Sequence, residues 1–409
     1  MAEVANNPNT AVEKTFKHLI LLIHGLNGTP EGDMKGLKFL LKRKLQIKFS
    51  DAVEQNFEIH AISSNRGKTN DGIIKGSERI FEEVLDLLKN NKNNSINLSI
   101  IGHSLGGIYG RYLIFLLEKH KLFEVKLNPF NFFTLATPHL GSLHHIKQFG
   151  FNSVPSWLSN FLLTQTIRDL MLLDEKLLMF KMCTEDEFLI PLKRFCRRVI
   201  YSNLRYDLSV SYETSAIKIK NNYFDGLFLK KKFGGLTTSC ILNDDHDENK
   251  LETFIDNNEG LEESNDEDVQ IIDANNMKKG SHHGKNGEVP FSDENHNNIE
   301  ESGDLENYPA LNTNDNFCKE VDHKKLTESV ESSLDAETNS TDPVSPKDKQ
   351  REKLMFDGLN KLKFERYACI FNKPLTAHID IIGKLDNEKS LESNLVLNHI
   401  VENFCKNVY

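Results

Sequence analysis

The chain has 409 residues, of which 38% are hydrophobic, and its formal net charge is −10. This is enough apolar material for a sizeable core, which excludes a wholly disordered protein. The first residues lack the apolar segment of a secretory signal, and no run approaches the roughly 20 apolar residues of a transmembrane helix. We therefore expect a cytoplasmic protein. The six cysteines are widely spaced without a C-x-x-C pair, so we expect no metal site, and no motif calls for a cofactor.

The first part of the chain alternates between apolar runs of β type and amphipathic helical patterns. Strands that alternate with helices of this length form βαβ units, so the pattern predicts a mostly parallel sheet covered by helices on both faces. The predicted strands are 17–28, 56–65, 95–104 and 129–139, and the predicted helices between them are 32–46, 69–91 and 106–120.

Beyond these elements the alternation stops, and an apolar helical stretch over 149–194 predicts a cap inserted before the next strand. The pattern then predicts strands over 195–203 and 364–371 and a closing helix over 394–408. We expect residues 1–16 to be a flexible N-terminus. The predicted domain therefore comprises residues 17–240 and 351–409.

Residues 241–350 separate the two parts of this predicted domain and differ sharply in composition. They contain 29 Asp and Glu against 9 Lys, so the rest of the chain is net basic. A segment so acidic and so poor in aromatic residues buries too little apolar surface to offset its ordering entropy, which predicts a disordered insert. The insert is interpreted either as a spacer or as a segment that binds an unknown protein partner.

The motif GHSLG places Ser104 between a predicted buried strand and a predicted helix. This is the context of a nucleophile elbow, in which a tight strand-to-helix turn presents a serine at the carboxyl edge of a sheet. The backbone N–H of Leu105 is then expected to be one donor of an oxyanion hole. The loop after the first strand is expected to supply the second donor, from Leu26 or, failing that, Asn27.

A serine nucleophile needs a base, and in this arrangement an acid and then a histidine follow the serine along the chain. Asp207 follows the strand 195–203, and His378 follows the strand 364–371, so both are predicted to lie on loops at the carboxyl edge. The rival candidates are three acids and one histidine: Asp169, Asp174, Asp225 and His399.

Further residues are predicted to shape the pocket. His24 and His103 flank the expected catalytic positions and are interpreted as pocket wall. Trp157 and Phe161 recur at helical spacing in the cap, where an apolar stripe favours either a lid for a fatty acyl chain or ordinary core packing.

These segments together resemble a known family. The residues HLILLIHGLNG, SIIGHSLGGIYGRY, FFTLATPHLG, RRVIYSNLRYDLSVSYETSAI and PLTAHIDII are similar to those of the serine esterases and lipase-like proteins that include the yeast lipid-droplet phospholipase. The resemblance covers roughly residues 17–235 and 355–405. It implies an α/β-hydrolase in which Ser104, Asp207 and His378 form a triad that acts on acyl esters of lipids.

The functional prediction is an intracellular lipase or phospholipase that uses an acyl-enzyme. A thioesterase would use the same residues, and a non-catalytic hydrolase-fold protein that binds partners is the alternative from another class. Lys230, Lys231 and Lys232 lie among apolar residues, a pattern interpreted either as peripheral association with a membrane or lipid droplet or as a solvated hairpin. No motif indicates nucleic-acid binding.

Overall fold

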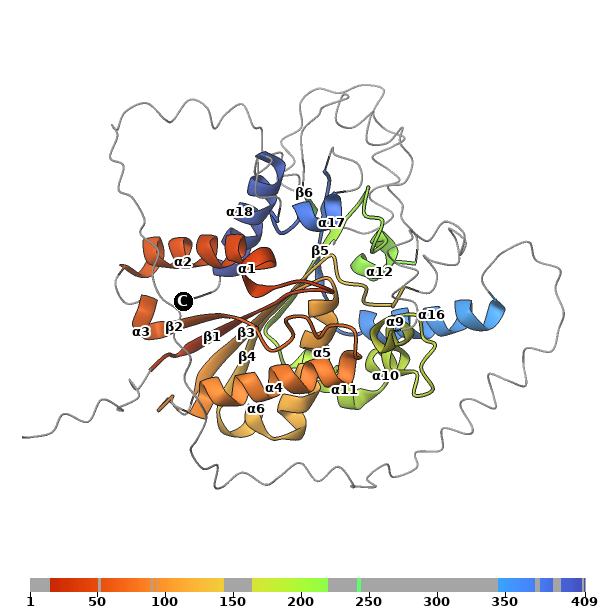
Figure 1. The fold of residues 1–409 in the computed structure, drawn as a ribbon, viewed down its shortest axis with the longest axis horizontal. Helices are drawn as coiled ribbons and strands as arrows, with labels where there is room; N and C mark the ends of the chain where they lie inside the picture. Colours follow the sequence, from red (N-terminus) through yellow and green to blue (C-terminus); the bar gives the residue numbers. More distant parts are fainter. Residues whose placement is uncertain are drawn as a thin grey trace, which may run out of the picture. The chain divides into compact units, whose positions relative to one another are not determined.

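A buried sheet organises the computed structural model, which describes residues 15–50, 53–89, 91–93, 95–142, 164–219, 241–243, 345–371, 376–384, 391–406 and 408. Its order is β2-β1-β3-β4-β5-β7-β6 (Figure 1). All neighbours pair in parallel except β6, which runs antiparallel to β7 at the edge. The strands are β1 (His18–Ile23), β2 (Phe57–Ala61), β3 (Ile96–His103), β4 (Leu127–Leu135), β5 (Arg197–Asn203), β6 (Ile241–Asn243) and β7 (Glu365–Cys369).

Helices cover both faces of this sheet (Figure 1). One face packs against α4 (Ile73–Lys89), α5 (Leu105–Lys119), α9 (Gln165–Leu170), α10 (Leu178–Thr184), α11 (Asp186–Lys193) and α16 (Pro346–Asn360). The other face packs against α2 (Lys35–Phe49) and α18 (Leu391–Cys405). Short helices complete the described part: α1 (Pro30–Asp33), α3 (Val53–Asn56), α6 (Leu122–Val125), α12 (Tyr212–Ala216) and α17 (Ala377–Asp380).

The predicted α/β-hydrolase fold is confirmed by this layered arrangement. Strand β1 shows the physical reason, because all six of its residues are buried and its sequence HLILLI is almost wholly apolar. Such a run suits a strand covered on both faces, which in turn requires helices on both sides. The described elements all belong to one compact unit of residues 1–273 and 342–409.

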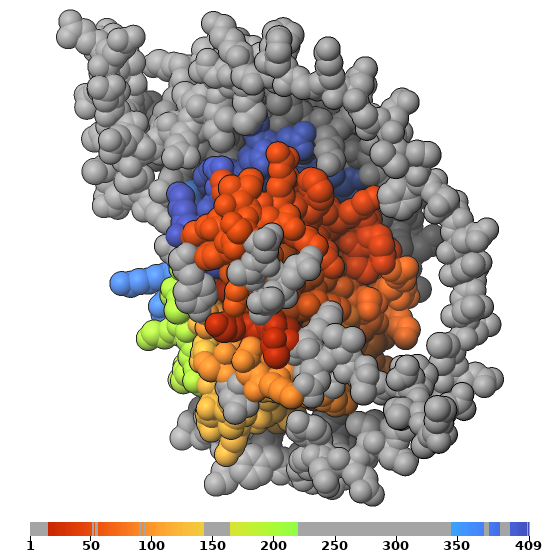
Figure 2. Space-filling model, turned by 90° about the vertical axis from the view of Figure 1, so that its left-hand side faces the viewer, coloured from red at the N-terminus to blue at the C-terminus, as the bar shows by residue number. Residues whose placement is uncertain are grey.

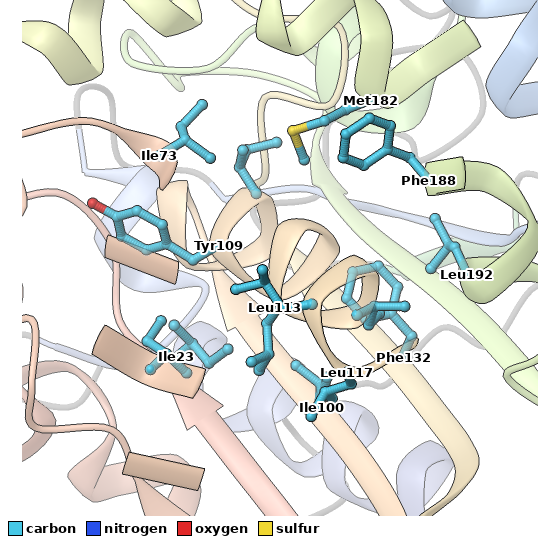
Figure 3. Close-up of a cluster of buried hydrophobic side chains, with 14 of the residues drawn as sticks. Ile23, Ile73, Ile100, Tyr109, Leu113, Leu117, Phe132, Met182, Phe188 and Leu192 are labelled. Atoms are coloured by element: carbon cyan, nitrogen blue, oxygen red, sulfur yellow. The ribbon is translucent and has the colours of Figure 1, made fainter. Parts of the chain in front are cut away.

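Helix α5 lies at the centre of the larger core cluster (Figure 3). Its side chains Tyr109, Leu113 and Leu117 are buried between the sheet and the surrounding helices. Because α5 begins directly after Ser104, this packing fixes the position of that serine. The residues around α5 come from β1, β3, β4, α4, α10 and α11: Ile23, Ile100, Phe132, Ile73, Met182, Phe188 and Leu192.

The structure differs from the sequence prediction at three boundaries. Phe16, assigned to a flexible N-terminus, is buried, and its carbonyl accepts a hydrogen bond from Asn91 Nδ2 at 2.9 Å. Residues 241–243, placed in the insert, form β6 because they pair with β7. Residues 346–350 begin α16, where the Ser345 hydroxyl caps the first turn by accepting from the N–H of Asp348. The rest of the predicted insert lies outside the described residues.

The cap prediction can be compared only in part, because residues 143–163 lie outside the described residues. The described remainder is helical, as α9, α10 and α11 show. Among the helices that the structure describes, none combines the length and the apolar character needed to cross a membrane.

Candidate active site

Ser104 lies at the turn between β3 and α5 with a strained backbone, φ 54° and ψ −127°. Two glycines let the chain close this turn. A Cβ added to Gly102 would lie 2.5 Å from Gly107 Cα, and one added to Gly106 would lie 2.1 Å from the carbonyl oxygen of Ile23. Strain of this kind costs about 1–3 kcal/mol and persists only where the surroundings hold it.

Hydrogen bonds to the Ser104 backbone supply that restraint. Its N–H donates to the carbonyl of Leu135 at 2.8 Å, and its carbonyl accepts from Thr137 Oγ1 at 3.0 Å. The strained serine is therefore held by β4 and the loop that follows it, at the carboxyl edge of the sheet where open α/β sheets bind ligands.

Ser104, His378 and Asp207 form one hydrogen-bonded chain. Ser104 Oγ lies 2.9 Å from His378 Nε2, and His378 Nδ1 lies 2.9 Å from Asp207 Oδ2. An ionised carboxylate only accepts hydrogen bonds, so the imidazole proton belongs on Nδ1. This leaves the Nε2 lone pair facing the serine hydroxyl, which is the orientation that a general base requires.

The surroundings of Asp207 keep it charged although its side chain is only 2% exposed. Its Oδ1 accepts from the backbone N–H groups of Ser209 and Val210, each at 2.9 Å, and its Oδ2 also accepts from Asn203 Nδ2 at 2.8 Å. Burial alone would raise the pKa of Asp207, but the nearby His378 and these hydrogen bonds outweigh burial and hold the pKa below its usual value.

Two side chains at the ends of strands hold the segment that carries His378. His103 Nε2 donates to the backbone carbonyl of His378 at 2.9 Å, and the two rings lie 4.9 Å apart between centroids. Asn203 Nδ2 donates to the carbonyl of Ala377 at 3.1 Å. Burial lowers the pKa of His103 to about 3, so this ring is neutral and acts as a fixed donor.

The loop after β1 passes directly beside Ser104. A Cβ added to Gly25 would lie 2.8 Å from Ser104 Cβ and 3.4 Å from its Oγ. In the described part of the chain, the N–H groups of Leu26 and Leu105 donate to no other group. The N–H of Asn27, the fallback donor, is already bonded to Thr69 Oγ1 at 2.9 Å, which excludes it.

Thr69 joins this loop to the buried interior. Its carbonyl accepts from Thr166 Oγ1 at 2.7 Å and from the Tyr109 hydroxyl at 3.3 Å. Thr69 and Thr166 are both fully buried. A continuous hydrogen-bonded path therefore runs from the start of α9 through Thr69 to Asn27, whose backbone is left-handed with φ 54°.

Asp33 connects the same loop to the segment after α17. Its carboxylate is 3% exposed, accepts from the N–H of Thr29 at 3.1 Å and pairs with Lys384 Nζ at 2.6 Å. The loop after β1 and the segment that follows His378 are therefore joined by an ion pair, in addition to their connections to the sheet.

Among the predicted wall residues, His24 and His103 are buried, at 1% and 4% exposure. The ring of each one bonds a backbone carbonyl, His24 that of Gly25 and His103 that of His378. Their observed contacts therefore support the loops of the site. Trp157 and Phe161 lie outside the described residues.

The rival candidates are engaged elsewhere. Asp169 accepts from the N–H of Ile73 at 2.8 Å, and Asp174 accepts from the N–H of Leu178, the first residue of α10, at 2.8 Å. His399 lies in α18 and bonds the hydroxyl of Tyr201. Asp225 lies outside the described residues.

Sequence reasoning missed three residues that support the site: Asn203, Thr69 and Lys384. Asn203 carried a usable signal, since an amide at the end of a buried strand is seldom placed there for packing. Thr69 and Lys384 carried none, because their roles depend on contacts between segments distant in sequence.

Comparisons with known proteins identify the family of the chain. A family model described as "Putative serine esterase (DUF676)" matches residues 13–217, half of the chain. In Saccharomyces cerevisiae, "Putative lipase YDL109C" is 29% identical over 227 residues, 54% of this chain and 33% of the relative. "Putative lipase ROG1" from the same yeast is 28% identical over 206 residues, 49% of this chain and 28% of the relative. The match thus spans a third or less of either relative's length.

Two solved structures are similar at low identity. Phospholipase PlaB from Legionella pneumophila has 18% identity and a TM-score of 0.33, with 48% of this chain and 41% of that chain covered. A cell surface hydrolase from Lactobacillus plantarum has 15% identity and a TM-score of 0.28, with 50% and 75% covered.

Proposed function

Because the chain belongs to the serine esterase family DUF676, we propose that it is a serine hydrolase that cleaves acyl esters of lipids through Ser104, His378 and Asp207. The observation that carries the proposal is the hydrogen-bonded chain at the strained turn. Ser104 Oγ lies 2.9 Å from His378 Nε2, and the other ring nitrogen lies 2.9 Å from the buried Asp207.

In the first half of the reaction His378 Nε2 accepts the proton of the Ser104 hydroxyl while Oγ attacks the ester carbonyl carbon. The carbonyl oxygen becomes an oxyanion that accepts hydrogen bonds from the N–H groups of Leu26 and Leu105. Asp207 stabilises the imidazolium through Nδ1. When the tetrahedral intermediate collapses, the bond to the alkoxy oxygen breaks and His378 gives its proton to the leaving alcohol.

In the second half water attacks the Ser104 acyl ester, with His378 Nε2 now accepting the water proton. The carboxylic acid leaves as the same proton returns to Ser104 Oγ, so the enzyme is restored. Neither half needs a redox cofactor, because only protons and the acyl group move.

The lipid part of the proposal draws on two supports. The yeast relatives are named lipases. In this chain, Tyr206 and Leu208 stand on either side of Asp207 and are 44% and 57% exposed, which gives the edge of the site an apolar surface. Each methylene that an acyl chain buries contributes about 0.8 kcal/mol, so such a surface favours long acyl groups over short ones.

The test is hydrolysis of a matched panel of glycerolipids and acyl-thioesters by the wild type and by Ser104→Ala. We expect release of fatty acid from the oxygen esters by the wild type alone. Turnover confined to the thioesters would instead favour a thioesterase. Hydrolysis that persists in Ser104→Ala would overturn the assigned nucleophile.

A further inference from the structure

We propose that helix α2 is a docking surface for a lipid surface that carries anionic phospholipid. Its charge is one-sided, since Lys35–Phe49 contains six Lys and Arg and no Asp or Glu. Figure 2 shows the surface of α2, in orange-red, turned toward the viewer. This inference rests on the proposed lipid hydrolysis, because docking on a lipid surface would bring the enzyme to its substrate.

The inner side of α2 is fixed to the fold. Leu37, Leu41 and Leu45 are fully buried in the cluster that includes α18. Two of the cations also contribute to this packing. Lys44 Nζ pairs with Glu402 at 3.0 Å, and Lys48 Nζ donates to the carbonyl of Cys405 at the end of α18 and to that of Val408 beyond it. The position of α2 is therefore fixed, and with it the position of the side chains on its outer side.

The outer side combines cations with large apolar side chains. Lys35, Lys38 and Arg43 are exposed, and within the described part of the chain no carboxylate pairs with them. Phe39, between them on the helix, is 59% exposed, and Ile47 is 73% exposed on the same outer side. At 100° per residue Phe39 lies opposite the buried leucines, so it points away from the protein.

This combination fits one partner chemistry. Anionic headgroups attract Lys and Arg, while an apolar side chain that projects among the cations enters the boundary between headgroups and acyl chains. A nucleic acid would use the cations but leave Ile47 and the centrally placed Phe39 in water unless bases stack on the ring. The apolar pair therefore favours the lipid surface.

The position of α2 connects docking to catalysis. Helix α2 follows the loop that carries Leu26, and Asp33, just before it, pairs with Lys384 in the segment after His378. The first turns of α2 thus lie at the carboxyl edge of the sheet, close to the segment that follows His378. A protein docked through Lys35, Lys38 and Phe39 would hold its site next to the lipid.

The experiment measures co-flotation of the full chain with vesicles of phosphatidylcholine alone and with phosphatidylserine added. The test variant is Lys35→Glu/Lys38→Glu/Arg43→Glu. Its matched control, Lys121→Glu/Lys193→Glu/Lys361→Glu, changes the net charge equally on exposed residues of the opposite helical layer. We expect binding to the anionic vesicles by the wild type and the control, and roughly 100-fold weaker partitioning of the α2 variant.

A second variant, Phe39→Ser, tests the apolar part. We expect it to bind the vesicles more weakly than the wild type, and we expect this difference to remain when salt screens the charges. Equal binding by the α2 variant and the control would overturn the proposal, as would wild-type binding to single-stranded RNA but not to vesicles. Labelling of Ser104 by a fluorophosphonate reports the site separately. Normal labelling of the α2 variant together with loss of its flotation supports docking through α2. Absence of labelling in the wild type counts against the proposed hydrolase and not against docking.

Discussion

Two serine–histidine pairs in the described part of the chain have similar distances and different surroundings. Ser104 Oγ lies 2.9 Å from His378 Nε2, and Ser99 Oγ lies 2.7 Å from His18 Nε2. Ser99 sits within β3 and is fully buried, with His18 beside it on β1. A short contact between a hydroxyl and an imidazole is therefore no sign of a nucleophile by itself.

Three features separate the pairs. Ser104 has a strained backbone at the sheet edge and is partly exposed, whereas Ser99 continues a buried strand. His378 Nδ1 bonds the carboxylate of Asp207, whereas His18 Nδ1 has no partner within the described residues. Burial also lowers the pKa of His18 to about 3, so that ring is a poor base. Access, a strained backbone and a carboxylate partner on the histidine distinguish the proposed nucleophile.

Replacing the carboxylate should have the largest effect. In Asp207→Asn the amide can donate to His378 Nδ1, which moves the ring proton to Nε2. The Nε2 atom then faces Ser104 with a proton already bound and cannot accept the proton of the serine hydroxyl. We expect kcat to fall by about 10⁴-fold with little change in thermal stability. Steady-state hydrolysis of a soluble ester measures this. A loss below tenfold would mean that Asp207 does not orient the base.

Loosening the proposed oxyanion loop should have an intermediate effect. Thr69→Val keeps the shape of the side chain but removes the acceptor for the N–H of Asn27. Because Leu26 precedes Asn27, we expect kcat to fall about 10- to 100-fold with KM nearly unchanged, which is less than the loss of a donor itself. Thr69→Ser retains the hydroxyl and should restore kcat. A rise in KM alone, or failure of Thr69→Ser to restore kcat, would contradict a role in positioning the loop.

Breaking the buried pair should cost stability and spare activity. Ser99→Ala leaves His18 Nε2 unbonded in the interior, so the free energy of unfolding should fall by about 1–3 kcal/mol. Chemical denaturation measures the loss, and kcat per folded molecule should stay at the wild-type value. Strongly reduced turnover in a folded Ser99→Ala protein would erase the contrast between the two pairs.

A last expected effect, small within any one pH unit, is on the pH dependence of stability. The pKa of His18 is lowered from 6.5 to about 3 by burial, so below pH 6.5 the unfolded chain binds a proton that the folded chain does not. His18 thus lowers stability by about 1.4 kcal/mol per pH unit as the pH falls from 6.5 toward 3. In His18→Phe this slope should be shallower by up to that amount. An unchanged slope in denaturation at several pH values would show that His18 titrates normally.

The sequence supports the strands and the proposed triad more securely than the details around them. The run in β1 is almost wholly apolar, which sufficed to predict that strand, and GHSLG after a predicted strand marked Ser104 as the candidate nucleophile. The role of Thr69 and the Asp33–Lys384 pair could not be predicted, because they depend on how close the loops lie in the fold. The Phe16 and β6 boundaries failed for a similar reason: Phe16 accepts a hydrogen bond from the distant Asn91, and residues 241–243 pair with β7, and neither partner is evident from the local sequence.

The most direct test maps the serine that a fluorophosphonate modifies, by mass spectrometry of the wild type, Ser104→Ala and Ser99→Ala. We expect a single adduct on Ser104 in the wild type, the same adduct in Ser99→Ala and none in Ser104→Ala. An adduct on Ser99, or labelling that survives in Ser104→Ala, would contradict this expectation.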